Sequence, residues 1–187
     1  ATSALGLCYE TGMGVEQDEA LAVELYRQAA QRGYAPAQCN LGFCYYQGIG
    51  VEENNDEAFR WFAMAAEREF PRAMNLLGEC FDQGYGVEQD SRRAVELFQA
   101  ARERGYVPAA TALGLCYELG RGVEQDKARA AELYREAAPA GDVRAQCNLG
   151  YCYYQGLGVE RDRWAAYHQN TQAAENGYPR AVHPMGQ

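Results

Sequence analysis

Seven cysteines and two histidines are the residues of this chain that could carry out redox, metal or nucleophilic chemistry. Neither a Cys-x-x-Cys motif nor a Cys/His cluster with metal-ligand spacing is present. His168 and His183 lie near the C-terminus without a Ser, Cys or Asp at the spacing of a catalytic triad. We therefore expect no metal site, no cofactor and no enzymatic activity.

Gly-x-Gly turns are a second motif that could do chemistry, because such loops can wrap a phosphate group. Phosphate-binding loops of that kind follow a strand and open a helix. Here Gly48-Ile49-Gly50 follows a helical pattern and has an equivalent every 36 residues, so we interpret it as a structural turn. A net charge of -9, from 17 basic and 26 acidic residues, works against binding to phosphate backbones or anionic lipid. We expect neither a nucleic-acid partner nor membrane insertion.

The cysteines themselves predict buried thiols. Five of them recur at the same spacing, namely Cys8, Cys44, Cys80, Cys116 and Cys152. Equivalent residues in successive layers of stacked helices lie about 8–10 Å apart, whereas a disulfide needs Cα atoms within about 7 Å. Unpaired cysteines favour a reducing compartment, and we expect a cytoplasmic protein. A periplasmic or secreted location stays open, because a chain that begins without Met and in phase with the repeat indicates trimming.

The spacing of 36 residues organises the whole chain. A Leu-Gly pair recurs without insertion or deletion at Leu5-Gly6, Leu41-Gly42, Leu77-Gly78, Leu113-Gly114 and Leu149-Gly150. Fixed self-similarity of this length is typical of stacked repeats. We predict a single domain over 1–187, with repeats at 1–36, 37–72, 73–108, 109–144 and 145–180 and a partial repeat or tail at 181–187.

Each repeat is predicted to be a helix-turn-helix hairpin. In the second copy Ala37, Leu41 and Cys44 fall on one side of a helix that ends at Gly48. A second helix follows an Asp or Asn that can accept hydrogen bonds from its first amides, at Asp18, Asn54, Asp90, Asp126 and Asp162. Hairpins of this kind bury their apolar faces only by stacking on one another, which predicts an all-α solenoid.

The shared pattern AxxxLGxCYxxGxGVEQDxxxAxxLYxxAAxxGYxP resembles the Sel-1-like repeat (SLR) family, a relative of the tetratricopeptide repeat, over essentially the whole chain. The resemblance implies a right-handed α-α superhelix. It also implies a scaffold or adaptor that binds a protein or peptide segment in a concave groove lined by the first helices. Two departures affect the expected packing: Glu69 replaces the terminal Gly of the second repeat, and Arg102 replaces an Ala in the third. Some secreted SLR proteins pair cysteines within each repeat, but no second helix carries Cys here.

Positions within a repeat are numbered 1 to 36 from the predicted repeat starts. The groove would present the side chains at positions 3, 4, 7, 10 and 11. The expected partner-binding residues are Cys39, Asn40, Phe43, Tyr46, Gln47, Glu79, Asp82, Leu115, Glu118, Cys147, Asn148, Tyr151, Tyr154 and Gln155. Exposed aromatic side chains often carry binding energy, and the amides of Asn40 and Asn148 could bond to a ligand peptide group. These positions hold no Lys or Arg. We therefore expect a neutral or basic segment with apolar anchors.

Several alternatives remain open. The second and fifth repeats nearly coincide, as AQCNLGFCYYQGIGVE and AQCNLGYCYYQGLGVE. Duplication of a three-repeat block explains this, and the two aromatic patches could also act as paired anchors about 30 Å apart. The chain could instead be a self-associating structural array, or a regulatory repeat domain of a larger enzyme or signalling protein.

The two ends of the array carry different signals. Gln169, Asn170 and Pro184 predict that the array ends near residue 180 with a polar outer face. The first repeat shows no such adaptation, so we expect its face to continue into a further domain or to pack against another copy.

Overall fold

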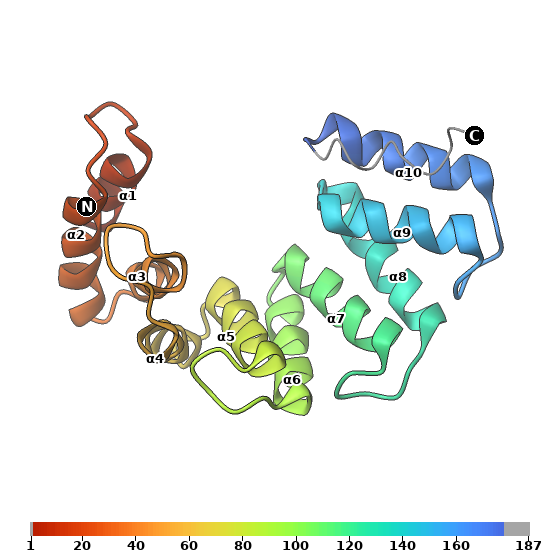
Figure 1. Ribbon diagram of the computed structural model, residues 1–187, viewed down its shortest axis with the longest axis horizontal. Helices are drawn as coiled ribbons and strands as arrows, with labels where there is room; N and C mark the ends of the chain where they lie inside the picture. Colours follow the sequence, from red (N-terminus) through yellow and green to blue (C-terminus); the bar gives the residue numbers. More distant parts are fainter. Residues whose placement is uncertain (1, 178–187) are drawn as a thin grey trace. The chain divides into compact units, whose positions relative to one another are not determined.

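The structure of the protein is a computed structural model that describes residues 2–177. All regular structure in this range is helical, with no strand (Figure 1). In chain order the helices are α1 Thr2–Thr11, α2 Glu19–Gln31, α3 Ala35–Gln47, α4 Asn55–Ala66, α5 Pro71–Gln83, α6 Ser91–Glu103, α7 Val107–Leu119, α8 Lys127–Ala137, the 3-10 helix η1 Ala138–Ala140, α9 Val143–Gln155 and α10 Arg163–Glu175. The predicted all-α fold of helix-turn-helix repeats is confirmed.

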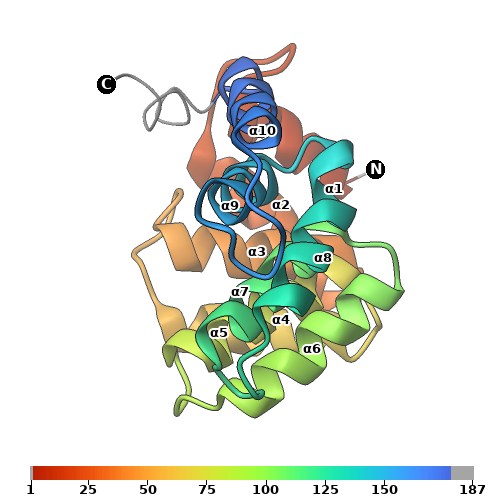
Figure 2. The ribbon, with the colours of Figure 1, turned by 90° about the vertical axis from the view of Figure 1, so that its right-hand side faces the viewer.

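The chain divides into two compact units, residues 1–97 and 98–187. In the first unit each helix packs on the next along the chain, from α1 to α5. In the second unit α7 packs on α8, α8 on α9 and α9 on α10, and α9 and α10 lie side by side in both ribbon views (Figures 1 and 2). From α3 onward the first helices begin two residues earlier than the predicted repeat starts, at 35, 71, 107 and 143.

The Leu-Gly pair lets the second helix of a repeat approach the first. A Cβ atom on Gly42 would lie 2.8 Å from the ring of Phe62, and one on Gly114 would lie 2.6 Å from the ring of Tyr134. Both rings are almost fully buried. Glycine recurs at this position because the ring lies directly on the backbone of the first helix.

The predicted helix ends are confirmed. The Asp18 carboxylate accepts a hydrogen bond from the Leu21 amide at 2.9 Å, and the Asn54 amide oxygen accepts one from the Glu57 amide at 3.0 Å. Equivalent bonds form at Asp90, Asp126 and Asp162. The first helices end at glycines in the left-handed conformation, Gly48, Gly84, Gly120 and Gly156. The end of the first helix and the start of the second helix of a repeat therefore depend on contacts within a few residues.

The second glycine of the Gly-x-Gly turn is where one repeat touches the one before it. Gly50 has φ 65°, and a Cβ atom there would overlap the Glu19 carbonyl and lie 2.9 Å from the Ala20 nitrogen. Gly158 approaches the backbone of Lys127 in the same way. Gly14 has a similar φ of 77°, but no atom lies within 4 Å of the corresponding Cβ position. The close backbone contact therefore requires a preceding repeat, whereas the left-handed conformation of the glycine occurs without one.

Glu69 is the only non-glycine residue in the range 2–177 with a positive φ, at 57°. The left-handed conformation costs a residue with a Cβ atom about 1–2 kcal/mol. We expect Glu69→Gly to raise the free energy of unfolding by about 1 kcal/mol, measured as a higher urea midpoint. Gly105→Ala is the matched control, because Gly105 has φ 82° and open space around its Cβ position; it should lower the midpoint. A loss of stability in Glu69→Gly would contradict this account.

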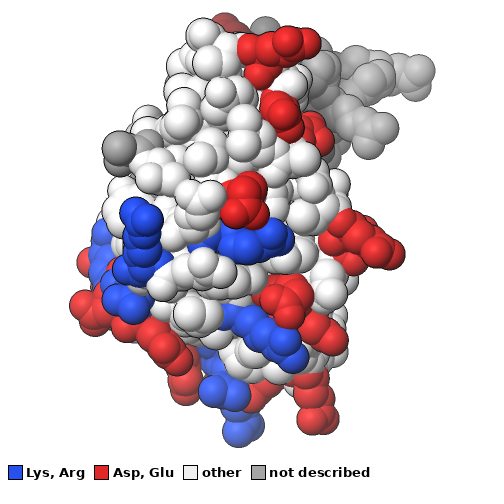
Figure 3. Space-filling view, turned by 90° about the vertical axis from the view of Figure 1, so that its left-hand side faces the viewer, with Lys and Arg blue, Asp and Glu red and all other residues white. Residues whose placement is uncertain are grey.

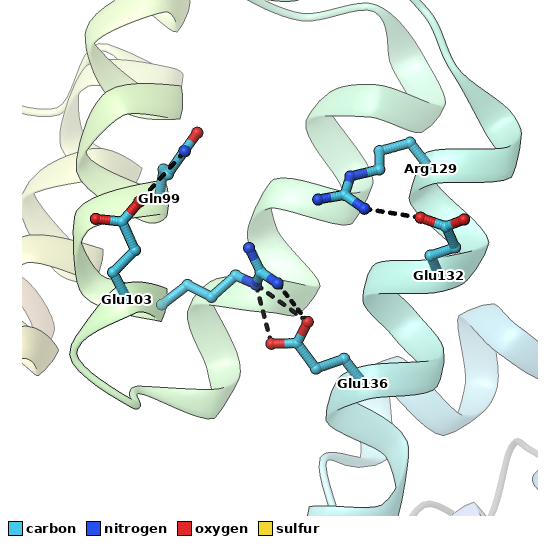
Figure 4. A network of polar contacts seen from close by, with 6 residues as sticks. Gln99, Glu103, Arg129, Glu132 and Glu136 are labelled. Carbon is cyan, nitrogen blue, oxygen red and sulfur yellow. Dashed lines mark hydrogen bonds and ion pairs between the residues drawn. The ribbon is translucent and has the colours of Figure 1, made fainter.

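Arg102 forms a link between neighbouring repeats. Its guanidinium donates to both carboxylate oxygens of Glu136 on α8, at 2.9 Å from Nε and 2.6 Å from Nη2 (Figure 4). The hydrogen bond from Arg102 lowers the pKa of Glu136. A second ion pair, Arg129 with Glu132, lies along α8 in the same view. The arginine that replaces a small residue in the third repeat thus joins α6 to α8.

Each helix in the range 2–177 falls short of the length and apolar character that a bilayer span requires.

Candidate functional site

Solvent reaches the predicted groove positions to very different extents. Cys39 at position 3 is fully buried, and Asp82 at position 10 is 5% exposed. Position 3 is also buried at Asn75 and Thr111. For Cys39 the cover comes partly from α5, whose Arg72 donates a hydrogen bond to Asn40, the neighbour of Cys39 on α3. The prediction that Cys39 and Asp82 line an open groove is therefore wrong.

Position 10 turns toward the second helix of its own repeat. The Tyr26 hydroxyl donates to the Glu10 carboxylate at 2.5 Å, and the Tyr134 hydroxyl donates to the Glu118 carboxylate at 2.6 Å. Burial, and then the adjacent carboxylate, raises the pKa of both tyrosines. Glu118, a predicted groove residue, is thus committed to the interior packing of its hairpin.

A sequence signal for this pairing exists but is visible only across repeats. Glu at position 10 accompanies Tyr at position 26 in the first and fourth repeats, whereas the second repeat has Tyr46 with Phe62. The tyrosine of this pair is thus on the second helix in the first and fourth repeats, and on the first helix in the second repeat. In the second repeat this leaves an aromatic side chain at position 10.

In the first unit the structure brings together Asn40, Phe43, Tyr46, Arg72 and Tyr85, which we name the first patch. The ring centroids of Phe43 and Tyr46 lie 6.4 Å apart, and those of Tyr46 and Tyr85 lie 5.7 Å apart. Beside them is a shallow pocket without room for a water molecule, lined by Tyr46, Phe62, Leu76, Glu79, Cys80 and Tyr85. Two other predicted residues are nearby in the sequence: Gln47 is exposed, and Glu79 is half-buried.

Arg72 and Tyr85 are members of the first patch that the sequence analysis missed. Arg72 Nη1 donates to Asn40 Oδ1 at 3.1 Å, and the guanidinium carbon lies 5.3 Å from the centre of the Phe43 ring. The expectation of a groove without a basic residue is therefore wrong for this unit. Arg72 was counted at the end of the second repeat, whereas α5 already begins at Pro71 and places it beside α3.

In the second unit, exposed apolar residues on α7 and α9 include Leu115, Leu119 and Tyr151, which with Tyr154 and Gln155 we name the second patch. Leu115 and Leu119 are four residues apart and share one face of α7. Leu119, which was not among the predicted binding residues, is 53% exposed, and Tyr151 is 52% exposed.

The remaining predicted residues of this unit are engaged or half-buried. Arg161 lies 5.8 Å from the Tyr154 ring centre and donates from Nε to the Tyr154 carbonyl at 3.0 Å. Asn148 makes a side-chain hydrogen bond with Tyr134. Cys147 is half-buried. Tyr151 is therefore the most accessible predicted aromatic residue of this surface, whereas Tyr154 and Asn148 are half-buried.

The sequence model of the Sel1 repeat family matches five times, at residues 1–34, 35–70, 71–106, 107–142 and 143–178. The chain belongs to the Sel1 repeat family. From the second repeat onward the matched repeats begin at the first helices, two residues before the boundaries expected from the Leu-Gly phase. Sel1 repeat proteins generally act as non-catalytic scaffolds for protein interactions.

Solved structures of Sel1 repeat proteins agree with this assignment. A Sel1 repeat protein from Oxalobacter formigenes superposes with a TM-score of 0.88 at 34% identity, covering 96% of this chain and 72% of its own. The protective antigen c5321 of uropathogenic Escherichia coli, with an SLR fold, gives 0.81 at 38% identity and covers 96% of this chain. This chain spans only 38% of the c5321 chain. No curated protein matches it.

The cysteines of this Sel1 repeat chain are all free thiols. The predicted burial is confirmed for Cys44, Cys80, Cys116 and Cys152, whereas Cys8 is half-buried. Burial raises the pKa of Cys44 and Cys80 to about 12, which keeps these thiols uncharged at neutral pH. Helicobacter pylori cysteine rich protein B shares the fold at 23% identity and a TM-score of 0.55, covering 67% of this chain and 93% of its own.

The histidines and the possible metal ligands were the other candidates for chemistry. No group of three or more His, Cys, Asp or Glu side chains in the described part of the chain could hold a metal ion. The ring of His168 stacks on Trp164, with centroids 5.6 Å apart. His183 and Pro184 lie outside the described residues.

The outer face of the fifth repeat is aromatic. Tyr167 is 56% exposed and Trp164 is also exposed, whereas Asn170 is buried against Gly150. The expectation of a polar outer face from Gln169-Asn170 is therefore wrong, because position 26 points into its own hairpin. At the equivalent of Tyr167 in the second repeat, Phe59 packs edge-on against Phe81 of the next repeat, with centroids 5.5 Å apart.

Proposed function

We propose that this Sel1 repeat chain is a scaffold or adaptor that binds segments of partner proteins on the first-helix surfaces of its repeats. The observation that supports this most is the contiguous run of Phe43, Tyr46 and Tyr85 in the first patch. Aromatic residues on an accessible surface are the type that dominates interface energetics. The second patch adds Leu119 and Tyr151, each more than half exposed.

Apolar anchors are the feature of the partner that both patches support. A neutral or basic segment was expected because no basic residue was foreseen in the groove. Because Arg72 lies in the first patch, this reason for expecting a neutral or basic segment does not apply to the first unit. Each patch lies within one unit, and we propose each as a binding surface in its own right.

The patches are tested by a lysate pull-down with quantitative mass spectrometry. The groove variant combines Phe43→Ala, Tyr46→Lys, Tyr151→Ala and Tyr154→Lys. We expect partner recovery to fall by about tenfold or more, since loss of one interface anchor typically costs 2 kcal/mol or more. Helical content and melting must match the parent protein.

The matched control is Tyr167→Lys, which changes an exposed aromatic residue outside both patches. It should retain the partners that the groove variant loses. Equal recovery of partner proteins by the parent protein and the groove variant would contradict the proposal.

Self-association is a second candidate, supported by the exposed faces of the first and fifth repeats. Leu5 is 44% exposed, although the equivalent leucines of the other four repeats are buried. The view from the side of α1 and α2 shows a broad area of uncharged residues (Figure 3). Light scattering over a wide concentration range distinguishes the two functions: mass should rise with concentration and fall back in Tyr167→Lys if copies stack.

A further inference from the structure

We propose that the first patch binds a carboxylate group next to an apolar side chain, with Arg72 as the anion-binding residue. This inference rests on the proposed function and specifies the chemistry of the partner segment for one of its two surfaces. It reverses the ligand charge that the sequence alone suggested.

Arg72 is a half-buried arginine without an acidic partner. It contacts the Asn40 amide oxygen and the Phe43 ring, and no carboxylate in the range 2–177 pairs with it. A guanidinium has five N–H donors in a rigid fork that matches a carboxylate. Only one donor direction is used by Asn40, so the others can bind an anion.

Side chains from three repeats fix the position of this guanidinium. The Asn40 amide makes a hydrogen bond with the Tyr26 hydroxyl, which itself donates to Glu10. Asn40 is thus a positioning residue for Arg72, because its amide oxygen already accepts from the guanidinium. A side chain that is already fixed loses less entropy on binding than a free one.

The apolar half of the site lies along α5 from Arg72. Leu76 is one helical turn further on and lines the shallow pocket with Tyr46 and Tyr85. Glu79 also lines that pocket and accepts a hydrogen bond from Asn75 at 2.9 Å. A ligand carboxylate is therefore expected at Arg72, with the apolar side chain beside it.

Helix geometry sets the spacing of the ligand groups. At 1.5 Å per residue, four to seven residues along α5 cover about 6–10 Å. An extended peptide covers this distance in about two or three residues. The ligand we infer carries Leu or Phe two or three positions from Asp, Glu or a terminal carboxylate.

The test uses fluorescein-labelled decapeptides and fluorescence anisotropy on the full chain. One series has an amidated C-terminus, a fixed Leu or Phe, and Glu at one to four positions on either side; a second series replaces Glu with Gln. We expect Glu peptides of the right spacing to bind about 10- to 100-fold more tightly than Gln peptides, as hydrogen bonds to a charged group allow. A third series with Gln and a free C-terminal carboxylate shows whether a terminal carboxylate serves as well.

Variants assign the effect to Arg72. Arg72→Gln should remove the preference for Glu over Gln, and Arg72→Lys should restore it only in part, because an ammonium lacks the fork. Arg60→Gln is the control, since Arg60 lies on α4 in an exposed ion pair with Glu57, and it should leave the preference unchanged. Melting curves verify that each variant is folded.

The outcomes separate the two proposals. Equal binding of Glu and Gln peptides that Tyr46→Lys abolishes would overturn the carboxylate inference and leave the proposed function intact. Binding that is insensitive to both Tyr46→Lys and Arg72→Gln, or no binding in any series, would overturn both for this patch.

Discussion

Gly50→Ala should lower the free energy of unfolding by about 2–5 kcal/mol, whereas Gly14→Ala should lower it by only about 1–2 kcal/mol. Both residues have a positive φ, so both pay the strain of a left-handed alanine, about 1–2 kcal/mol. Only Gly50 meets the backbone at the start of α2, and overpacking there adds about 1–3 kcal/mol. The difference between the two variants measures the contact between repeats.

Urea titrations followed by far-UV circular dichroism give this comparison directly. Gly158→Ala should behave like Gly50→Ala, because Gly158 meets the backbone of Lys127 in the second unit. Equal midpoints for Gly14→Ala and Gly50→Ala would show that conformation alone explains why this glycine recurs.

The second large effect is alkaline unfolding, which should begin above about pH 9. Burial raises the pKa of Cys44 and Cys80 to about 12, and it raises the pKa of Tyr26 and Tyr134 as well. Unfolded thiols and phenols ionise near pH 8.5 and 10, so the unfolded chain releases its protons first as the pH rises. The stabilisation is therefore complete at neutral pH, and each group loses about 1.4 kcal/mol per pH unit between its unfolded and folded pKa values.

Urea midpoints measured between about pH 8 and 11 test this slope. Tyr134→Phe and Cys80→Ala should each give a shallower fall than the parent protein, whatever their stability at neutral pH. Tyr167→Phe serves as the control, because it removes a hydroxyl from an exposed ring and should leave the slope unchanged. A stability that does not change up to pH 11 would show that the buried groups ionise freely in the folded protein.

The number of repeats, their hairpin form and the glycine and Asp or Asn positions at the helix ends could all be predicted from the sequence. These features depend on contacts within a few residues, such as the Asp18 carboxylate with the Leu21 amide and the left-handed turn at Gly48. A local pattern that recurs five times at the same spacing predicts the same local structure in every repeat. The burial of the recurrent cysteines followed for the same reason, because a repeated apolar stripe must face the shared core.

The accessibility of individual side chains could not be predicted in this way, because it depends on how the repeats pack. A helical wheel places Cys39 opposite the core stripe of its own helix, but neighbouring first helices lie side by side and bury it. Asn170 was expected on the outer face of the fifth repeat, but it points into its own hairpin, and Tyr167 is exposed instead. These outcomes depend on contacts between repeats, which the periodicity of a single helix does not contain.

The candidate site shows the same division. The sequence identified Phe43, Tyr46 and Tyr151 as surface aromatic residues, because their type and position are properties of one helix. It missed Arg72 and Tyr85, which reach the first patch from the start of α5 and from the loop that follows it. Side chains 29 to 39 residues apart meet there only because the repeats stack, and that stacking determines the charge of the surface as well as its shape.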